Sequence, residues 1–370
     1  MRLTHSQDLS VNSDGQLFDV PSGLHLPWDS INWSKWLEDL SASLVEKSDF
    51  LKFFSRSHGL LAKHLNFTDD FYATVLPQFV QLLRSAPEHF PGKPWLLPRR
   101  FRCKVVLSST QAFLILIGSI FFPVGSHGHS LFFILTNPST TCKLKTKCLE
   151  VYFRYQLDIF HDSAKKYSLE YSRVGTNRVF HEDPIIGAQD FLPDLATGYI
   201  EDAPSAVTKA IFCNLHIGLT FSTYAQSKNK KMMFTFFLGG GVFRFGLAQE
   251  ELVLIQFPEL LLSTFLADDL LSHEVLCVTG CRRYSKVIKN LGVSLRLAVR
   301  ELVIDIDVPH QFVFMDASNR RQDPEVPFQT SFRRDLHKVC VAFASCATSS
   351  LATGFWGAGC FGHDSELSVS

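Results

Sequence analysis

The sequence predicts an α/β protein in which a helical first half precedes a three-layer α/β/α second half. Three observations support this prediction. The 370 residues exceed one average domain, so two structural units are expected. Apolar residues recur every three or four positions up to about residue 160, which is the period of helices. Beyond about residue 195, short apolar runs alternate with helical stretches, which indicates a sheet covered by helices.

The first half is expected to hold a polar, flexible arm at 1–24 and a helical region at 25–185. Four helical stretches are expected, at 28–56, 71–86, 105–122 and 147–160. Residues 112–124, AFLILIGSIFFPV, are strongly apolar. A bilayer span needs about 20 residues, and Pro123 ends this run, so a buried helix is favoured over a membrane span.

The second half, 186–370, is expected to form the α/β domain. Strands are expected at 232–238, 273–280 and 301–308, and helices from Gln249 onward and at 328–346. Ligand sites of α/β sheets lie beyond the carboxyl ends of strands, and three glycines follow directly on the strand expected at 232–238.

The most informative stretch is GGGVFRFGLAQEEL, which contains Gly239, Gly240 and Gly241. Consecutive glycines let the main chain approach a ligand closely. Glu250 and Glu251 follow, and two neighbouring acids raise the pKa of one of them, as general acid catalysis near neutral pH requires. The alternative is that the glycines form an ordinary turn and the acids interact with a helix dipole.

The composition argues against several other classes of protein. Lys plus Arg and Asp plus Glu each number 36, so bulk charge does not favour nucleic-acid binding. The nine cysteines show neither a disulfide framework nor a zinc pattern, and no metal site is expected. No secretory signal pattern opens the chain, so we expect a nuclear or cytoplasmic protein without membrane association.

Gly-Gly-Gly followed by seven residues and Gln-Glu-Glu, here 239–251, resembles the signature of poly(ADP-ribose) glycohydrolases. Other segments are similar to family segments and stand in family order: 26–30, 107–123, 143–154, 198–203, 257–266, 276–285 and 352–364. The resemblance implies a helical accessory domain packed on a macrodomain, with 198–203 as the strand ahead of the catalytic loop. It also implies a monomer without cofactor that acts on poly(ADP-ribose) and ADP-ribosylated proteins.

The resemblance also assigns roles. Glu251 corresponds to the acid that protonates the leaving 2′-oxygen of a ribose–ribose bond and then activates water. Glu250 and Gln249 would orient the ribose, and Gly239, Gly240 and Gly241 would lie along the diphosphate. The further contacts implied are Ile200 and Glu201 at the adenine, and Gly359 and Phe361 in a second loop at the diphosphate and distal ribose.

The chain departs from the family pattern in several places. The family carries Asp-Phe-Ala-Asn before the glycines, where this chain has Met232 to Thr235, and 209–231 resemble added sequence. Residues 287–297 hold no aromatic side chain to stack on adenine, Phe355 replaces an Asn, and the chain ends soon after 362–364. The alternatives are therefore a catalytically impaired ADP-ribose-binding protein or inactive paralogue, and a protein that binds a partner through its helical half.

Overall fold

The computed structural model describes the greater part of the chain. The described residues are 9–11, 17–19, 28, 32–91, 97, 103–124, 129–175, 200–213, 217, 241–245, 248–267, 269–290, 296–301, 308–318, 325–346 and 350–354.

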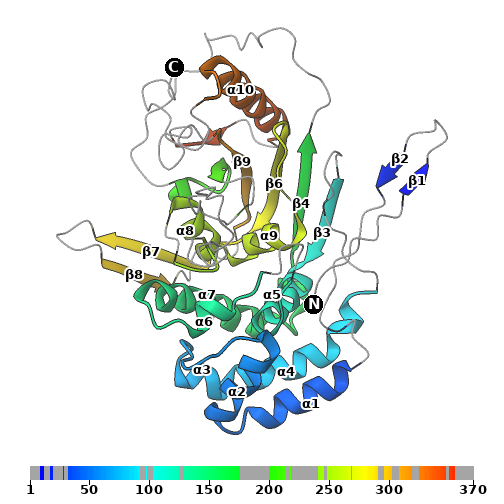
Figure 1. Ribbon diagram of the computed structural model, residues 1–370, viewed down its shortest axis with the longest axis vertical. Helices are drawn as coiled ribbons and strands as arrows, with labels where there is room; N and C mark the ends of the chain where they lie inside the picture. Colours follow the sequence, from blue (N-terminus) through cyan, green and yellow to red (C-terminus); the bar gives the residue numbers. More distant parts are fainter. Residues whose placement is uncertain are drawn as a thin grey trace.

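Helices gather at one end of the molecule, and the sheet rises from them (Figure 1). These helices are α1 (Trp33–Ser43), α2 (Lys47–His58), α3 (Asp69–Thr74), α4 (Leu76–Ser85), α5 (Ser109–Phe121), α6 (Phe132–Thr136) and α7 (Thr140–Ile159), with the short 3₁₀ helices η2 (Ala86–His89) and η3 (Ser163–Lys165). Capping side chains determine where several of these helices begin, because they accept hydrogen bonds from backbone N–H groups that have no partner within the helix. Ser108 and Gln111 form a capping box at α5, and Ser139 accepts a hydrogen bond from the amide of Cys142 at α7.

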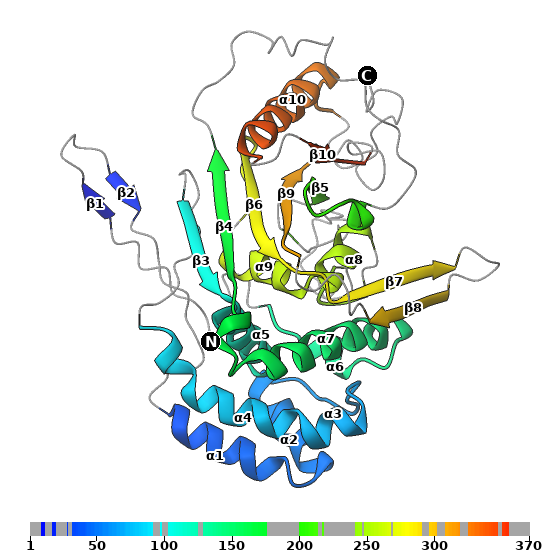
Figure 2. The same ribbon diagram turned by 180° about the vertical axis from the view of Figure 1, so that it is seen from behind.

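A six-stranded sheet has the order β10-β5-β9-β6-β4-β3. Its strands are β3 (Cys103–Ser108), β4 (Ser168–Gly175), β5 (Thr208–Cys213), β6 (Glu274–Cys281), β9 (His310–Asp316) and β10 (Leu351–Ala352). Strands β10, β5 and β9 run parallel, whereas β6, β4 and β3 pair antiparallel. Two further pairs, β1 (Leu9–Val11) with β2 (Leu17–Asp19) and β7 (Ser285–Asn290) with β8 (Arg296–Glu301), lie outside this sheet (Figure 2).

Helices cover both faces of the sheet, which confirms the three-layer α/β/α prediction. Helix α10 (Phe328–Ser345) packs on one face, where Val313 and Met315 of β9 meet Val341 and Ala342. Phe312 and Phe314 of β9 point to the other face, into a larger core. This core is shared with α5, α8 (Gln249–Gln256), η6 (Pro258–Leu261) and α9 (Leu262–Leu266).

The structure changes several predicted elements. The helix expected at 105–122 starts at Ser109, because Ser108 caps it and the preceding residues form β3. The region 25–185 thus contributes two strands, β3 and β4, to the sheet. The limits of the arm and the two domains remain predictions.

The prediction that 209–231 is added sequence is wrong for its first five residues. Residues 208–213 form β5, which lies between β10 and β9, and Ala210 and Ile211 are buried. Residues 200–202, expected as a strand, form the 3₁₀ helix η4 (Ile200–Asp202). The strand expected at 232–238 lies outside the described residues. Of the strand expected at 301–308, the structure describes Glu301, which ends β8, and Val308, which lies outside the strands.

The apolar run at 112–124 behaves as a buried helix. Its residues from Ala112 to Ile117 are fully buried in α5. Among the helices that the structure describes, none combines the length and the apolar character needed to cross a membrane.

Candidate functional site

The carboxyl ends of β5 and β9 meet the first turn of α8. Cys213 and Asp316 are the last residues of these parallel strands and lie opposite each other in the register. Glu250, in the first turn of α8, is close enough to Cys213 to raise the pKa of its thiol electrostatically, in addition to the larger effect of burial. The paired acids therefore lie at the sheet edge where α/β folds bind ligands.

The three residues of the Gln-Glu-Glu motif occupy different environments. Gln249 is exposed, Glu250 is 7% exposed and Glu251 is fully buried. Consecutive helical residues point about 100° apart, so the two carboxylates project in different directions. Both carboxylate oxygens of Glu251 are shielded from solvent.

Gly241 opens a tight turn just ahead of α8. Its φ is 128°, a value that side-chain-bearing residues rarely adopt, and the amide of Arg244 donates to its carbonyl over 3.0 Å. Phe243 stacks on His129 at a ring-centroid distance of 4.8 Å, which holds the turn against the helical region. Gly239 and Gly240 lie outside the described residues.

A buried lysine of α7 contacts this turn. The Lys145 ammonium donates to the carbonyl oxygens of Gly241 at 3.1 Å, Val242 at 2.8 Å and Arg244 at 2.9 Å. Burial lowers the pKa of Lys145 to about 8, and the nearby negative charge of Glu251 opposes that shift. Lys145 thus links the glycine turn and the buried acid electrostatically.

Arg283 joins η4 to the end of α8. Its guanidinium donates to the carbonyl of Glu201 at 3.0 Å, to Asp202 Oδ1 at 2.7 Å and to Gln256 Oε1 at 2.6 Å. Glu201 is 3% exposed, and its Oε2 has no hydrogen-bond partner among the described residues. A buried acceptor of this kind is costly unless a ligand donates to it.

The loop after β10 begins beside η4. A Cβ added at Gly354 would lie 3.5 Å from Cδ1 of Ile200, so Ile200 and this loop are neighbours. The segment between η4 and β5 is held by Lys209, which donates to the Pro204 carbonyl at 3.0 Å and to His310 Nδ1 at 2.9 Å. Burial lowers the pKa of His310 to about 3, so its ring is neutral and accepts this hydrogen bond.

A comparison with known protein families found a match to the second half of the chain. Residues 209–369 match the family described as poly(ADP-ribose) glycohydrolase, macro domain fold. This match relates residues 209–369 to the poly(ADP-ribose) glycohydrolases. The matched range begins at β5 and includes α8, β9, α10 and the loop after β10.

The structure describes six of the predicted site residues: Ile200, Glu201, Gly241, Gln249, Glu250 and Glu251. Hydrogen bonds of Arg283 connect η4, which holds Ile200 and Glu201, with the end of α8. Lys145 connects Gly241 with Glu251. Gly239, Gly240, Gly359 and Phe361 lie outside the described residues.

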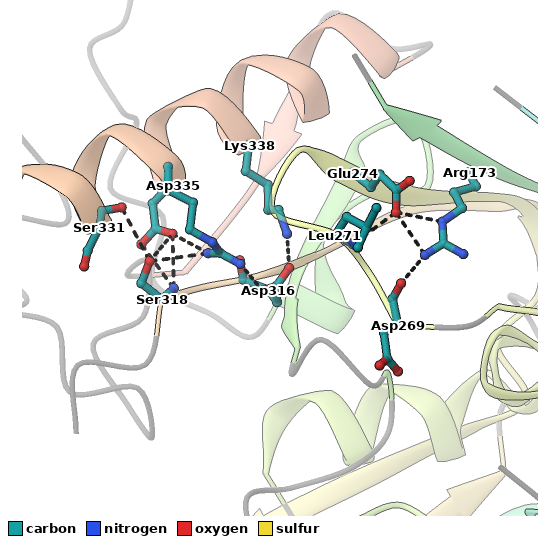
Figure 3. A network of polar contacts seen from close by, with 10 residues as sticks. Arg173, Asp269, Leu271, Glu274, Asp316, Ser318, Ser331, Asp335 and Lys338 are labelled. Atoms are coloured by element: carbon teal, nitrogen blue, oxygen red, sulfur yellow. Dashed lines mark hydrogen bonds and ion pairs between the residues drawn. The ribbon is translucent and has the colours of Figure 1, made fainter. Parts of the chain in front are cut away.

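Sequence reasoning did not find the polar network behind the carboxyl end of β9. Lys338 of α10, fully buried, pairs with Asp316, and Arg334 pairs with both Asp316 and Asp335 (Figure 3). Asp335 in turn accepts from the Ser318 hydroxyl at 2.8 Å. One sequence feature could have indicated this network. Arg334 and Lys338 are cations four residues apart on a helix, and that helix follows a strand that ends in Asp316.

Sequence reasoning also missed a buried cluster around Glu259. Tyr167 and Tyr284 both donate to its Oε1, the latter at 2.6 Å, and the amide of Arg282 donates to its Oε2 at 2.9 Å. Gln156 of α7 donates to the hydroxyls of both tyrosines. These residues come from distant parts of the sequence, so no local pattern marks the cluster.

Proposed function

We propose that this chain hydrolyses the ribose–ribose glycosidic bonds of poly(ADP-ribose) and releases ADP-ribose. The observation that carries the proposal is the buried Glu251 in the first turn of α8, at the carboxyl end of β5 and in electrostatic contact with the lysine that holds the glycine turn. The family match supports the substrate class. The poor solvent access of Glu251 suits a proton transfer from which bulk water is excluded.

In the proposed reaction, the carboxylic acid of Glu251 gives its proton to the leaving 2′-oxygen. The glycosidic bond breaks with its electron pair on that oxygen, and an oxocarbenium-like ribose develops. Water then adds to the anomeric carbon and returns a proton to the Glu251 carboxylate. Glu250 and Gln249 would orient the ribose by hydrogen bonds.

The adenosine end of the bound ADP-ribose unit is proposed to lie against η4. The Oε2 atom of Glu201 needs a hydrogen-bond donor, and an adenine amino group would supply one. Ile200 would supply apolar contact beside the loop that begins at Gly354. The second loop, with Gly359 and Phe361, would flank the diphosphate.

The position of β5 also changes which residues correspond to the family's Asp-Phe-Ala-Asn. Ile211-Phe212-Cys213-Asn214 matches that motif at Phe and Asn, and Cys213 ends a strand next to α8. We therefore propose Asn214, rather than Thr235, as the counterpart of the ribose-contacting Asn. The added sequence would then follow Asn214, and Asn214→Ala is expected to weaken turnover about tenfold or more, whereas Thr235→Ala leaves it unchanged.

The decisive experiment compares the wild type with Glu251→Gln. Gln keeps the shape of the side chain but delivers no proton, so ADP-ribose release from labelled polymer should fall about a hundredfold or more. Affinity for ADP-ribose, measured by calorimetry, should persist. Glu38→Gln, on the exposed face of α1, serves as the matched control and should behave as the wild type.

Two other outcomes would change the assignment. Equal release by the wild type and Glu251→Gln would exclude Glu251 as the acid. Measurable ADP-ribose affinity with no release by either protein would favour the non-catalytic binding protein. A chain that neither binds nor hydrolyses would contradict the proposed function.

A further inference from the structure

Lys145 is buried to a degree that lysines seldom reach. It is 1% exposed in the middle of α7, while Lys143 and Lys147 on the same helix are exposed. Burying an ammonium costs free energy unless each of its donors finds an acceptor. Lys145 has three N–H bonds and three carbonyl acceptors within 3.1 Å, all of them in the turn at 241–244.

The three carbonyls fix the direction in which the turn presents its amides. A trans peptide is planar, and its C=O and N–H groups point in opposite directions. Because the carbonyls of Gly241, Val242 and Arg244 point toward Lys145, the amide N–H groups of the three residues that follow them point away from it. On that opposite side, backbone N–H groups supply the kind of donor with which main chain binds anions.

The helical region thus determines how the glycine turn is oriented. Lys145 comes from α7, about a hundred residues before the turn that it holds. The turn is further fixed on this side by Phe243 against His129 and by Arg244, whose guanidinium lies 4.7 Å from the ring centroid of Phe133. Among the described residues, no carbonyl contact of this type is found for Lys143 and Lys147, which are exposed.

We propose that Lys145 is a positioning residue of the glycohydrolase site. It holds the 241–244 turn so that its amides face the substrate diphosphate, and its positive charge attracts the Glu251 carboxylate that forms when the proton leaves. The proposal rests on the proposed function. It makes α7 part of the active-site architecture rather than a neighbouring support.

The test uses Lys145→Met, Lys145→Gln and the matched control Lys147→Met in the full chain. Lys145→Met removes all three donors, so ADP-ribose affinity should fall about tenfold or more, and turnover should fall about a hundredfold as the turn and Glu251 shift. Lys145→Gln keeps two donors without the charge and should retain more affinity than Lys145→Met, but not the turnover. Lys147→Met should match the wild type in both.

Affinity per folded molecule separates positioning from a purely structural role. Circular dichroism and thermal melting define the folded fraction, and Lys145→Gln, which still offers two donors to the buried carbonyls, supplies a folded variant even where Lys145→Met is unstable. Wild-type affinity and turnover in the folded Lys145 variants would overturn the proposal for Lys145 alone. Absence of ADP-ribose binding by the wild type would instead overturn the proposed function, and the proposal for Lys145 with it.

Discussion

Gly280 shows how one residue sets the local path of a central strand. It lies in β6 at the bulge between Thr279 and Cys281, with φ of 90°. A Cβ at this position would lie 2.3 Å from the carbonyl oxygen of Ser168 in β4. The backbone of β4 therefore passes where only glycine leaves room.

Gly280→Ala is expected to destabilise the fold by at least about 2 kcal/mol. The alanine would have to adopt a positive φ, and its Cβ would also clash with the backbone of β4, so two costs are summed. Gly59→Ala is the matched control, because Gly59 has a φ of 63° but no atom within 4 Å of an added Cβ. That control should cost about 1 kcal/mol. Urea unfolding of both variants measures the difference, and equal costs would refute a steric role for Gly280.

At the scale of elements, the Glu259 cluster holds η6 against the helical region. Burial raises the pKa of Glu259 to about 7 from an ordinary value of 4.5, against hydrogen bonds from Tyr167, Tyr284 and the amide of Arg282 that lower it. Between these two values the folded state keeps a proton that the unfolded state releases. The contribution of Glu259 to stability is therefore fully present below pH 4.5 and is lost as the pH rises toward 7.

Replacing Glu259 with Gln removes this titration. The stability of the wild type relative to Glu259→Gln should fall by up to about 3 kcal/mol between pH 4.5 and pH 8. Urea unfolding across this range measures it, with Glu38→Gln on the exposed face of α1 as the control. A difference that stays constant with pH would show that Glu259 does not titrate in this range.

Elements with strong periodicity were predictable from the sequence, and elements defined by distant contacts were not. Helix α10 and strand β6 lie close to their predicted ranges, because turn residues bound clear apolar patterns. Strand β3 was merged with α5, since its apolar residues run directly into the helix and only the Ser108 cap divides them. In the candidate site, the Gly-Gly-Gly and Gln-Glu-Glu signals are local, whereas Lys145 and Arg283 act across sequence separations of about 100 and 80 residues.

At the scale of the whole molecule, the helical region and the sheet share one core. The larger hydrophobic cluster joins residues of α1 to α7 with residues of β4, β6, β9 and α8. Only the small cluster beneath α10 is supplied mainly by the second half. The range matched by the family, 209–369, is therefore not a self-contained structural unit.

We accordingly predict that 186–370 expressed alone does not fold cooperatively, whereas the full chain does. Without the first half, β6 loses its partner β4 and becomes an open edge, and Leu276 and Val278 lose much of their apolar cover. Glu274, 1% exposed, would lose the Arg173 guanidinium that donates to it over 3.0 Å (Figure 3), and a buried carboxylate stripped of its partner typically costs about 3–5 kcal/mol. Gel filtration and thermal melting of the two proteins test this, and a monomeric 186–370 fragment with a sharp melting transition would contradict the shared core.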